Sequence, residues 1–217
     1  MTFIDKTLAI FGITAILSCG NVAPSVQEQI ANHFYGIGIE ESLEGNYPEA
    51  IANYTESLGE QPNQPEVYNN RGLVYAKEGK YAEAITDYNQ ALKYNPHFPE
   101  AFHNRGYARW QMGDKQGAIG DFSLAIYYNP QYVSAYNYRA TLYQELNSPQ
   151  GAVHDYTKIL IIEPNSIETY YCRGLAYQQM GDMPKAKQDL KQAAHFFADR
   201  GDVANQRKAE SVLARLP

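Results

Sequence analysis

The sequence of 217 residues lacks several features that define common classes of protein. It contains only two cysteines, too few for a disulfide-stabilised scaffold or a four-thiolate metal site. No lysine or arginine occurs between Lys6 and Arg71, and the chain has 18 basic against 24 acidic residues, a formal net charge of −6. An acidic chain does not have the electrostatic footprint of a protein that binds duplex nucleic acid. We therefore expect no nucleic-acid partner.

The motifs of common catalytic and cofactor sites are also missing. The five histidines do not follow a metal-ligand spacing, and none lies in an HExxH pattern. There is no GxSxG motif, no phosphate-binding loop and no dinucleotide-binding glycine pattern. Cys172 has no histidine three or four residues away, so we interpret it as a small packing residue. The sequence predicts a protein that is not an enzyme and holds no metal or cofactor.

One apolar run stands out, at residues 7–17 (TLAIFGITAIL), directly after Lys6. A membrane-spanning helix needs roughly 20 apolar residues, so this run is too short to span a bilayer. Its length is typical of the hydrophobic region of a signal peptide. Residues 1–18 are therefore predicted to form an export signal.

The residues that follow this run suggest how the signal is processed. Residues 16–19 (ILSC) resemble the lipobox of bacterial lipoproteins, in which the cysteine is lipidated and becomes the new amino terminus. The resemblance implies lipidation of Cys19 and a protein anchored on the periplasmic side of a bacterial-type membrane. Cleavage near Gly20 or Ala23 and an uncleaved anchor are the alternatives. Residues 19–30 are expected to form a linker and the start of the first helix.

Small and turn-forming residues recur every 34 residues along most of the chain. The small residues of one series are Gly38, Gly72, Gly106, Ala140 and Gly174. The prolines of a second series are Pro62, Pro96, Pro130 and Pro164. A fixed period of this length is the signature of a repeat protein. The five units defined by the period are 31–64, 65–98, 99–132, 133–166 and 167–200.

Each unit shows two apolar patterns of helical period, separated by a turn signal near its position 15. One helical pair cannot bury its apolar face alone, so the units are expected to stack into a solenoid. A stack of this kind needs a polar cap at its end. Residues 201–217 are predicted to be a C-terminal capping helix, with Val203, Ala209, Val212 and Leu216 on its apolar face.

The second unit, residues 65–98, shows the repeat pattern most clearly (PEVYNNRGLVYAKEGKYAEAITDYNQALKYNPHF). It resembles the tetratricopeptide repeat, with the signature residues Tyr68, Gly72, Tyr75, Ala84, Tyr88, Ala91 and Pro96. Glu41, Arg109 and Leu190 depart from the signature, because each replaces an aromatic residue in another unit. The resemblance implies an all-α fold, a right-handed superhelical solenoid of five antiparallel helix pairs, and a role in binding other proteins.

In such a stack, positions 2, 5, 6, 9 and 13 of each first helix line a concave groove. We expect peptide-binding residues in this groove at Asn69, Asn70, Leu73, Lys77, His103, Asn104, Tyr107, Trp110, Asn137, Tyr138 and Tyr171. Asparagine amides can bind the main chain of an extended peptide, and the aromatic rings supply rigid apolar contacts. The alternative is that several of these residues pack between neighbouring first helices. Lys77 is the one groove cation, which disfavours a clamp for a C-terminal carboxylate.

Charged residues also recur with the 34-residue period. Position 7 of units two to five is held by Arg71, Arg105, Arg139 and Arg173. Position 23 of the same units is held by Asp87, Asp121, Asp155 and Asp189. The first unit lacks both charges and carries Ile37 and Asn53 instead. Because the two charges are present together and absent together, we predict that they form structural ion pairs within a unit or between neighbours.

These features together predict a membrane-anchored adaptor that binds a protein or peptide client. The main alternative is a structural homo-oligomer that assembles through the groove or through oppositely charged ends. The first unit is strongly acidic, whereas residues 185–217 hold seven basic and four acidic residues, a net charge of +3. A carbohydrate ligand on the groove aromatics is a further alternative.

Overall fold

The computed structural model describes residues 24–217, and this part of the chain contains eleven helices and no strand. The predicted export signal, residues 1–18, and Cys19 lie outside the described residues. No helix within 24–217 has both the length and the apolar character needed to cross a bilayer.

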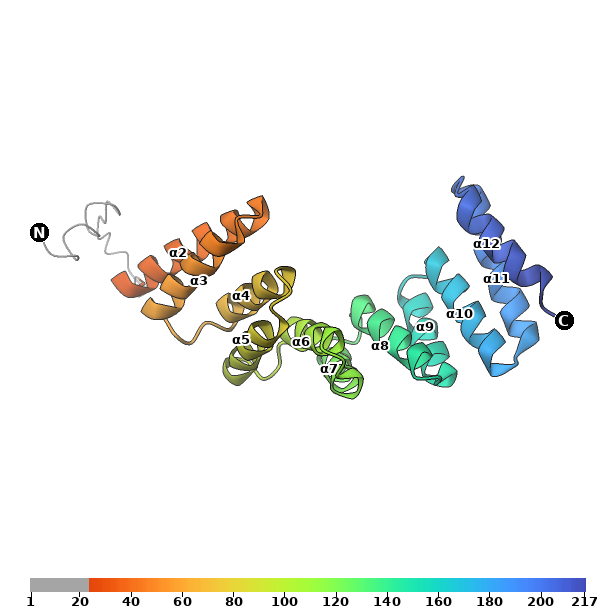
Figure 1. Cartoon of the computed structure of the whole chain (residues 1–217), viewed down its shortest axis with the longest axis horizontal. Helices are drawn as coiled ribbons and strands as arrows, with labels where there is room; N and C mark the ends of the chain where they lie inside the picture. Colours follow the sequence, from red (N-terminus) through yellow and green to blue (C-terminus); the bar gives the residue numbers. More distant parts are fainter. Residues whose placement is uncertain (1–23) are drawn as a thin grey trace, which may run out of the picture.

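Ten of the helices form five consecutive antiparallel pairs, one for each repeat unit. The pairs are α2 (Val26–Glu44) with α3 (Tyr47–Glu60), α4 (Pro65–Lys77) with α5 (Tyr81–Tyr94), α6 (Pro99–Gln111) with α7 (Lys115–Tyr128), α8 (Val133–Glu145) with α9 (Pro149–Ile162), and α10 (Ile167–Met180) with α11 (Met183–Asp199). Figure 1 shows the pairs following one another along an arc, with α4 and α6 on the inner side of α5 and α7. The all-α solenoid expected from the sequence is confirmed.

Small residues at fixed positions allow the two helices of a pair to pack closely. A Cβ atom added to Gly72 would lie 2.7 Å from Cε1 of Tyr88 in the partner helix, closer than any side chain tolerates. The turn between the helices needs a left-handed residue, which is Gly79 in the second unit (φ 76°) and Asn147 in the fourth (φ 53°). Both requirements follow from backbone geometry, and this explains why these positions recur every 34 residues.

The recurring prolines mark the end of the second helix of a unit. Helix α5 ends at Tyr94, two residues before Pro96, and α9 ends at Ile162, two residues before Pro164. Proline lacks a backbone N–H and disfavours the helical conformation of the preceding residue, so the chain leaves the helix there. The connection then leads directly into the first helix of the next unit.

A single helix, α12 (Val203–Ala214), packs against α11 at the end of the stack. Its residue Ala209 is fully buried, and Val212 packs with Leu216 against Ala186 and Leu190 of α11. Val203 is 51% exposed, so our assignment of this residue to the apolar face was wrong. It is the first residue of the helix, directly after the N-cap Asp202, and about half of its surface remains exposed to solvent.

All four predicted Arg–Asp pairs lie at ion-pair distance, each with two parallel hydrogen bonds between the guanidinium and the carboxylate. In the fourth unit, Nε and Nη2 of Arg139 donate to Asp155 Oδ2 and Oδ1 at 2.8 and 2.7 Å. The donor–acceptor distances in the other three units lie between 2.6 and 2.9 Å. The four aspartates are buried, so each carboxylate depends on its arginine for compensation of its charge.

Each arginine also contacts the preceding unit, an interaction that we did not anticipate. The third guanidinium nitrogen, Nη1, donates to a polar side chain in the second helix of the preceding unit. This side chain is at position 25 of that unit. These acceptors are Thr55 for Arg71, Asn89 for Arg105, Ser123 for Arg139 and Thr157 for Arg173. The Ser123 hydroxyl donates to the Ile119 carbonyl four residues earlier, which leaves its oxygen to accept from Arg139. One side chain therefore joins three helices at each junction.

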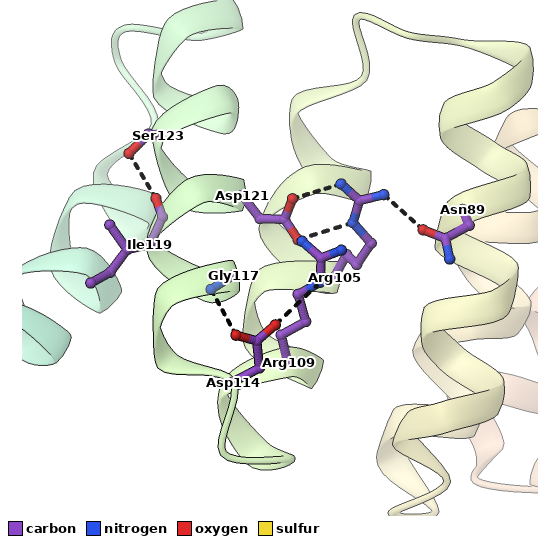
Figure 2. Close-up of polar contacts among 8 residues, drawn as sticks. All are labelled: Asn89, Arg105, Arg109, Asp114, Gly117, Ile119, Asp121 and Ser123. Atoms are coloured by element: carbon purple, nitrogen blue, oxygen red, sulfur yellow. Dashed lines mark hydrogen bonds and ion pairs between the residues drawn. The ribbon is translucent and has the colours of Figure 1, made fainter.

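The third unit adds a second arginine to this arrangement, as Figure 2 shows. Arg109 occupies the slot where most other units have tyrosine, and its Nη1 donates to Asp121 Oδ2 at 2.8 Å. Asp121 therefore binds both Arg105 and Arg109, while Arg105 reaches across to Asn89 in the preceding unit. The departure of Arg109 from the repeat signature thus has a structural explanation.

We expect Arg139→Met to destabilise the protein by about 3 kcal/mol, because it leaves the buried carboxylate of Asp155 without a counter-charge. Urea unfolding measures this loss. Arg207→Met on the exposed surface of α12 is the matched control and should change stability by less than about 0.5 kcal/mol. The double variant Arg139→Met/Asp155→Leu should recover most of the loss. If Arg139→Met and Arg207→Met were equally stable, the ion pair would not support the junction.

Candidate functional site

A cavity of about 410 Å³ lies between α4, α5, α6 and α8, and we call it the central pocket. Its wall comes mainly from the first helices of units two, three and four, with α5 completing one side. The lining residues are Leu73, Ala76, Lys77, Tyr81, Tyr88, His103, Asn104, Tyr107 and Tyr138. The pocket thus depends on the stacking of three successive units.

Six of the eleven candidate groove residues line the central pocket. They are Leu73, Lys77, His103, Asn104, Tyr107 and Tyr138. A seventh, Trp110, lies next to the pocket and makes edge contacts with Tyr107 and Tyr138, at ring-centroid distances of 6.5 and 5.8 Å. The part of the groove that belongs to units two to four therefore forms a common surface.

The asparagines take part in contacts between neighbouring first helices. Asn104 Nδ2 donates to Asn69 Oδ1 and Asn70 Nδ2 donates to the Tyr35 hydroxyl, both at 2.9 Å. Asn69 is only 6% exposed, so its placement on the groove surface was wrong. Position 5 of α4 faces the next first helix, α6, and the Asn69 amide is needed to pair with Asn104. The alternative of packing between first helices therefore holds for Asn69.

The two remaining candidates lie outside the central pocket. Asn137 is exposed on α8, and Tyr171 on α10 packs against the cluster formed by Leu190 and Leu216 near the capping helix. Neither residue lines the pocket, although Asn137 is next to the lining residue Tyr138 in sequence, and Tyr171 belongs to the fifth unit, farther along the arc (Figure 1). The eleven candidates do not form one continuous site.

Three lining residues were not among the candidates: Ala76, Tyr81 and Tyr88. Tyr88 occupies position 24, which we interpreted only as part of the repeat signature. A signal was present in the sequence, since units three and five fill that position with Phe122 and Leu190, which have no hydroxyl. Packing at this position does not require a polar atom.

Two buried polar atoms of the pocket lining have no hydrogen-bond partner. They are the Tyr88 hydroxyl and His103 Nδ1. Burial raises the pKa of the Tyr88 phenol far above its ordinary value, so the group remains protonated. Burial lowers the pKa of His103 to about 4, so its imidazole is neutral at pH 7. Unpaired buried groups of this kind are rare in folded proteins.

Aromatic rings account for the desolvation of His103. The ring centroids of Tyr132, Tyr138 and Phe122 lie 4.9, 5.4 and 5.5 Å from that of the imidazole. Tyr138 is held in place by stacking on Phe122, with centroids 5.7 Å apart and an interplanar angle of 11°. This packing creates a rigid apolar wall around one neutral hydrogen-bonding group.

The lining of the central pocket contains no carboxylate, although the whole chain is acidic. Its one charged residue is Lys77, whose side chain is exposed and whose Nζ lies 5.6 Å from the centroid of the Tyr47 ring. The pocket is therefore suited to a neutral group with apolar surface, or to a short stretch of main chain beside it.

The helical pairs and the pocket between their first helices define a helical-repeat solenoid. A family model described as TPR repeat matches residues 43–79 and 74–113, and one described as tetratricopeptide repeat matches 99–132 and 167–194. These matches cover more than half of the sequence. The chain belongs to the tetratricopeptide repeat family, whose members serve as protein–protein interaction modules. Neither model matches 133–166, where the structure nevertheless has the pair α8–α9.

Solved structures with the same fold support this assignment. A crystal structure of MamA protein is 26% identical over 81% of this chain and 96% of its own, with a TM-score of 0.73. YrrB, described as a TPR protein with an unusual peptide-binding site, covers 87% of this chain and 100% of its own with a TM-score of 0.70. At 16% identity, YrrB shows the fold alone. No curated protein sequence matches the chain.

A shorter structure contains a bound peptide. It is the first TPR of Spaghetti (RPAP3) bound to the HSP90 peptide SRMEEVD. It is 27% identical, covers 56% of this chain and 98% of its own, and has a TM-score of 0.54. This neighbour shows that a domain of related structure binds a peptide.

Acidification is expected to destabilise the protein through His103. The unfolded chain takes up a proton near the ordinary histidine pKa of 6.5, whereas the folded protein resists protonation until about pH 4. The unfolded state therefore binds more protons in this interval. The free energy of unfolding keeps its full value with respect to His103 above pH 6.5. It decreases as the pH falls below that value, by up to about 3 kcal/mol in total.

Urea unfolding between pH 7 and pH 4 tests this expectation. His103→Leu should reduce the dependence of the unfolding free energy on pH, because it removes the group that is desolvated in the folded state. His154→Leu, at an exposed position of α9, is the control. An identical pH dependence in the two variants would contradict the role assigned to His103.

Proposed function

We propose that this protein is a non-catalytic adaptor that binds a segment of another polypeptide on the inner face of its solenoid. The observation that carries the proposal is the central pocket, which three successive units build from aromatic and neutral polar side chains. Tyr107, Tyr138 and Trp110 give it the rigid aromatic surface that is typical of binding hot spots. Family membership and the peptide-bound RPAP3 structure support the same function.

The client should differ from the acidic peptide of the RPAP3 structure. A site for a terminal carboxylate requires several cations, whereas Lys77 is the one cation of the central pocket. The expected ligand is an internal, extended segment that places apolar and neutral polar side chains in the pocket.

Matched double variants test the groove. Lys77→Glu/Tyr107→Ser changes two residues of the central pocket, whereas Lys93→Glu/Tyr127→Ser makes the same changes at exposed positions of the second helices. In affinity capture from native membranes, we expect the pocket variant to lose client recovery by at least about tenfold. The control variant should keep it, because its changes lie outside the pocket.

Other results of the same capture would redirect the assignment. A client that is recovered equally with both variants would place binding elsewhere on the molecule. Recovery of the same chain alone, with no client, would overturn the adaptor and favour the homo-oligomer. Loss of self-association at high salt would then assign assembly to the oppositely charged ends.

We further propose that the protein is exported and attached to a bacterial-type membrane by lipid on Cys19, so that the solenoid faces the periplasm. The support is the apolar run at residues 7–17 and the lipobox-like residues 16–19. The first described helix begins at Val26, with the Ser25 side chain accepting from the N–H of Glu28. Only a short linker would then separate the lipid from the folded repeats.

Metabolic labelling with an alkyne fatty acid tests the anchor. We expect Cys19→Ser to lose the label and to leave the membrane fraction, because the lipidated thiol is gone. Cys172→Ser, at the second cysteine of the chain, is the matched control and should keep both. An unlabelled wild-type protein would exclude lipidation; it would then indicate simple cleavage if soluble, or an uncleaved anchor if membrane-bound.

A further inference from the structure

The first helix of the stack has an outer face that no other helix of the described residues covers. In the first helices of units two to five, the residues at positions 3 and 10 are buried where the unit packs on the preceding one; they are Val67, Val74, Ala101, Ala108, Ala135, Leu142, Thr169 and Ala176. The corresponding residues of α2 are His33 and Glu40, and both are exposed. Glu44, one turn after Glu40, is exposed on the same side of α2. The first helix therefore carries carboxylates where the internal helices carry packing residues.

The negative charge at this end of the stack has no compensation from the same chain. Residues 24–64 hold seven glutamates and no aspartate, lysine or arginine. None of these carboxylates takes part in an ion pair within the part of the chain that the structure describes. Like charges on one surface repel each other, so a cationic partner would stabilise this end.

The last helix has an outer face of the opposite charge. The side of α12 that contains the buried Ala209 packs against α11. Neither guanidinium on the opposite side, that of Arg207 or that of Arg215, has a hydrogen-bond or ion-pair partner among residues 24–217. The residues on this opposite side are all exposed, and they are Val203, Ala204, Arg207, Ser211, Ala214 and Arg215. This face thus has two unpaired cations, no carboxylate, and otherwise small uncharged residues that allow another helix to approach.

The two faces cannot meet within one chain. Helices α2 and α12 lie at opposite ends of the arc, with the other units between them (Figure 1). Two copies of the chain can bring an acidic face and a basic face together. Neither face contributes a residue to the central pocket, so a contact between the ends leaves the pocket open.

We propose that this protein associates head to tail, with the outer face of α2 in one copy bound to the outer face of α12 in a second copy. Arg207 and Arg215 then pair with the carboxylates of Glu40 and Glu44. The contact joins two different faces, so a third copy adds in the same way and a row of copies forms. Exposed ion pairs contribute little individually, and the association is therefore weak and sensitive to salt. This inference goes beyond the proposed function and does not depend on it.

Sedimentation equilibrium of the full chain in a density-matched nonionic detergent tests the association. At about 0.01 M salt the Debye length is about 30 Å, and at about 1 M salt it is about 3 Å. We expect the mean protein mass per particle to be at least about twofold larger at the lower salt concentration, because the charges of the two faces are then least screened. Two chains that merely shared a detergent micelle would remain together at the higher concentration.

Two charge-reversal variants identify the faces. Glu40→Lys/Glu44→Lys makes both outer faces basic, and Arg207→Glu/Arg215→Glu makes both outer faces acidic. Each variant alone should remain a single chain, because its two faces repel each other. An equimolar mixture should associate again, since each face of one variant then meets a face of opposite charge on the other.

A matched control separates these faces from net charge. Lys93→Glu/Lys158→Glu changes the net charge as much as Arg207→Glu/Arg215→Glu does, but at exposed positions of α5 and α9, and it should associate like the wild type. Equal thermal midpoints would show that the variants are folded. A wild type that stays a single chain at low salt, association that persists at high salt or in either charge-reversal variant alone, or a mixture that stays unassociated would overturn the proposal.

The central pocket can be tested separately from this contact. Lys77→Glu/Tyr107→Ser changes the pocket and leaves both outer faces intact, so it should associate like the wild type. Loss of client binding with normal association would concern the adaptor alone. Client binding by a protein that remains a single chain at low salt would overturn the head-to-tail contact and leave the adaptor in place.

Discussion

The repeating Arg–Asp ion pair is the interaction on which the arrangement of this solenoid depends. Its guanidinium binds the carboxylate of its own unit with two nitrogens and the preceding unit with the third. Because the guanidinium is planar and rigid, three hydrogen bonds fix the position of one first helix against two second helices. The same contact recurs at each of the four junctions between units. The first-helix side chains that line the central pocket come from three units that these junctions connect.

The sequence predicted the repeat, its period, the helical pairs and the partners of the four arginines. These features follow from local rules: a turn needs glycine or asparagine, a close approach needs a small residue, and a buried carboxylate needs a cation. The arginine pairing was predictable because the first unit lacks both charges together. It has Ile37 in place of the arginine and Asn53 in place of the aspartate. The acceptors of the third guanidinium nitrogen were not predicted, since threonine, asparagine and serine alternate at that position and conceal its common role.

The candidate site was predictable only in part. Helical periodicity places a residue on one face of its own helix, but it does not specify how far the neighbouring helix covers that face. Asn69 and Asn70 lie next to each other in α4, yet Asn69 is buried against α6 whereas Asn70 bonds to Tyr35 of α2. Tyr88 was missed for the same reason. Its side chain passes between the helices of its pair, so a second-helix residue reaches a pocket formed mainly by first helices.

The central pocket of this acidic protein has a lining that is neutral except for Lys77. Aromatic packing keeps His103 uncharged, and the carboxylates that pair with the arginines lie in the helix interfaces and do not line the pocket. The ion pairs thus lie at the junctions between units, while the pocket lining is neutral apart from Lys77. Because the ion pairs do not line the pocket, residues of the lining can change without loss of the junctions on either side.

The ends of the stack lack the connecting residues. The first unit has Ile37 where the others have arginine, and the last unit has Lys191 where the others have a neutral acceptor for the next arginine. Each internal unit therefore carries a complete connector on both sides, whereas each terminal unit carries half of one. A gene duplication of any internal unit would insert a segment that already fits its neighbours. The two terminal units then close the series of junctions, whereas the number of internal units between them can change in steps of 34 residues.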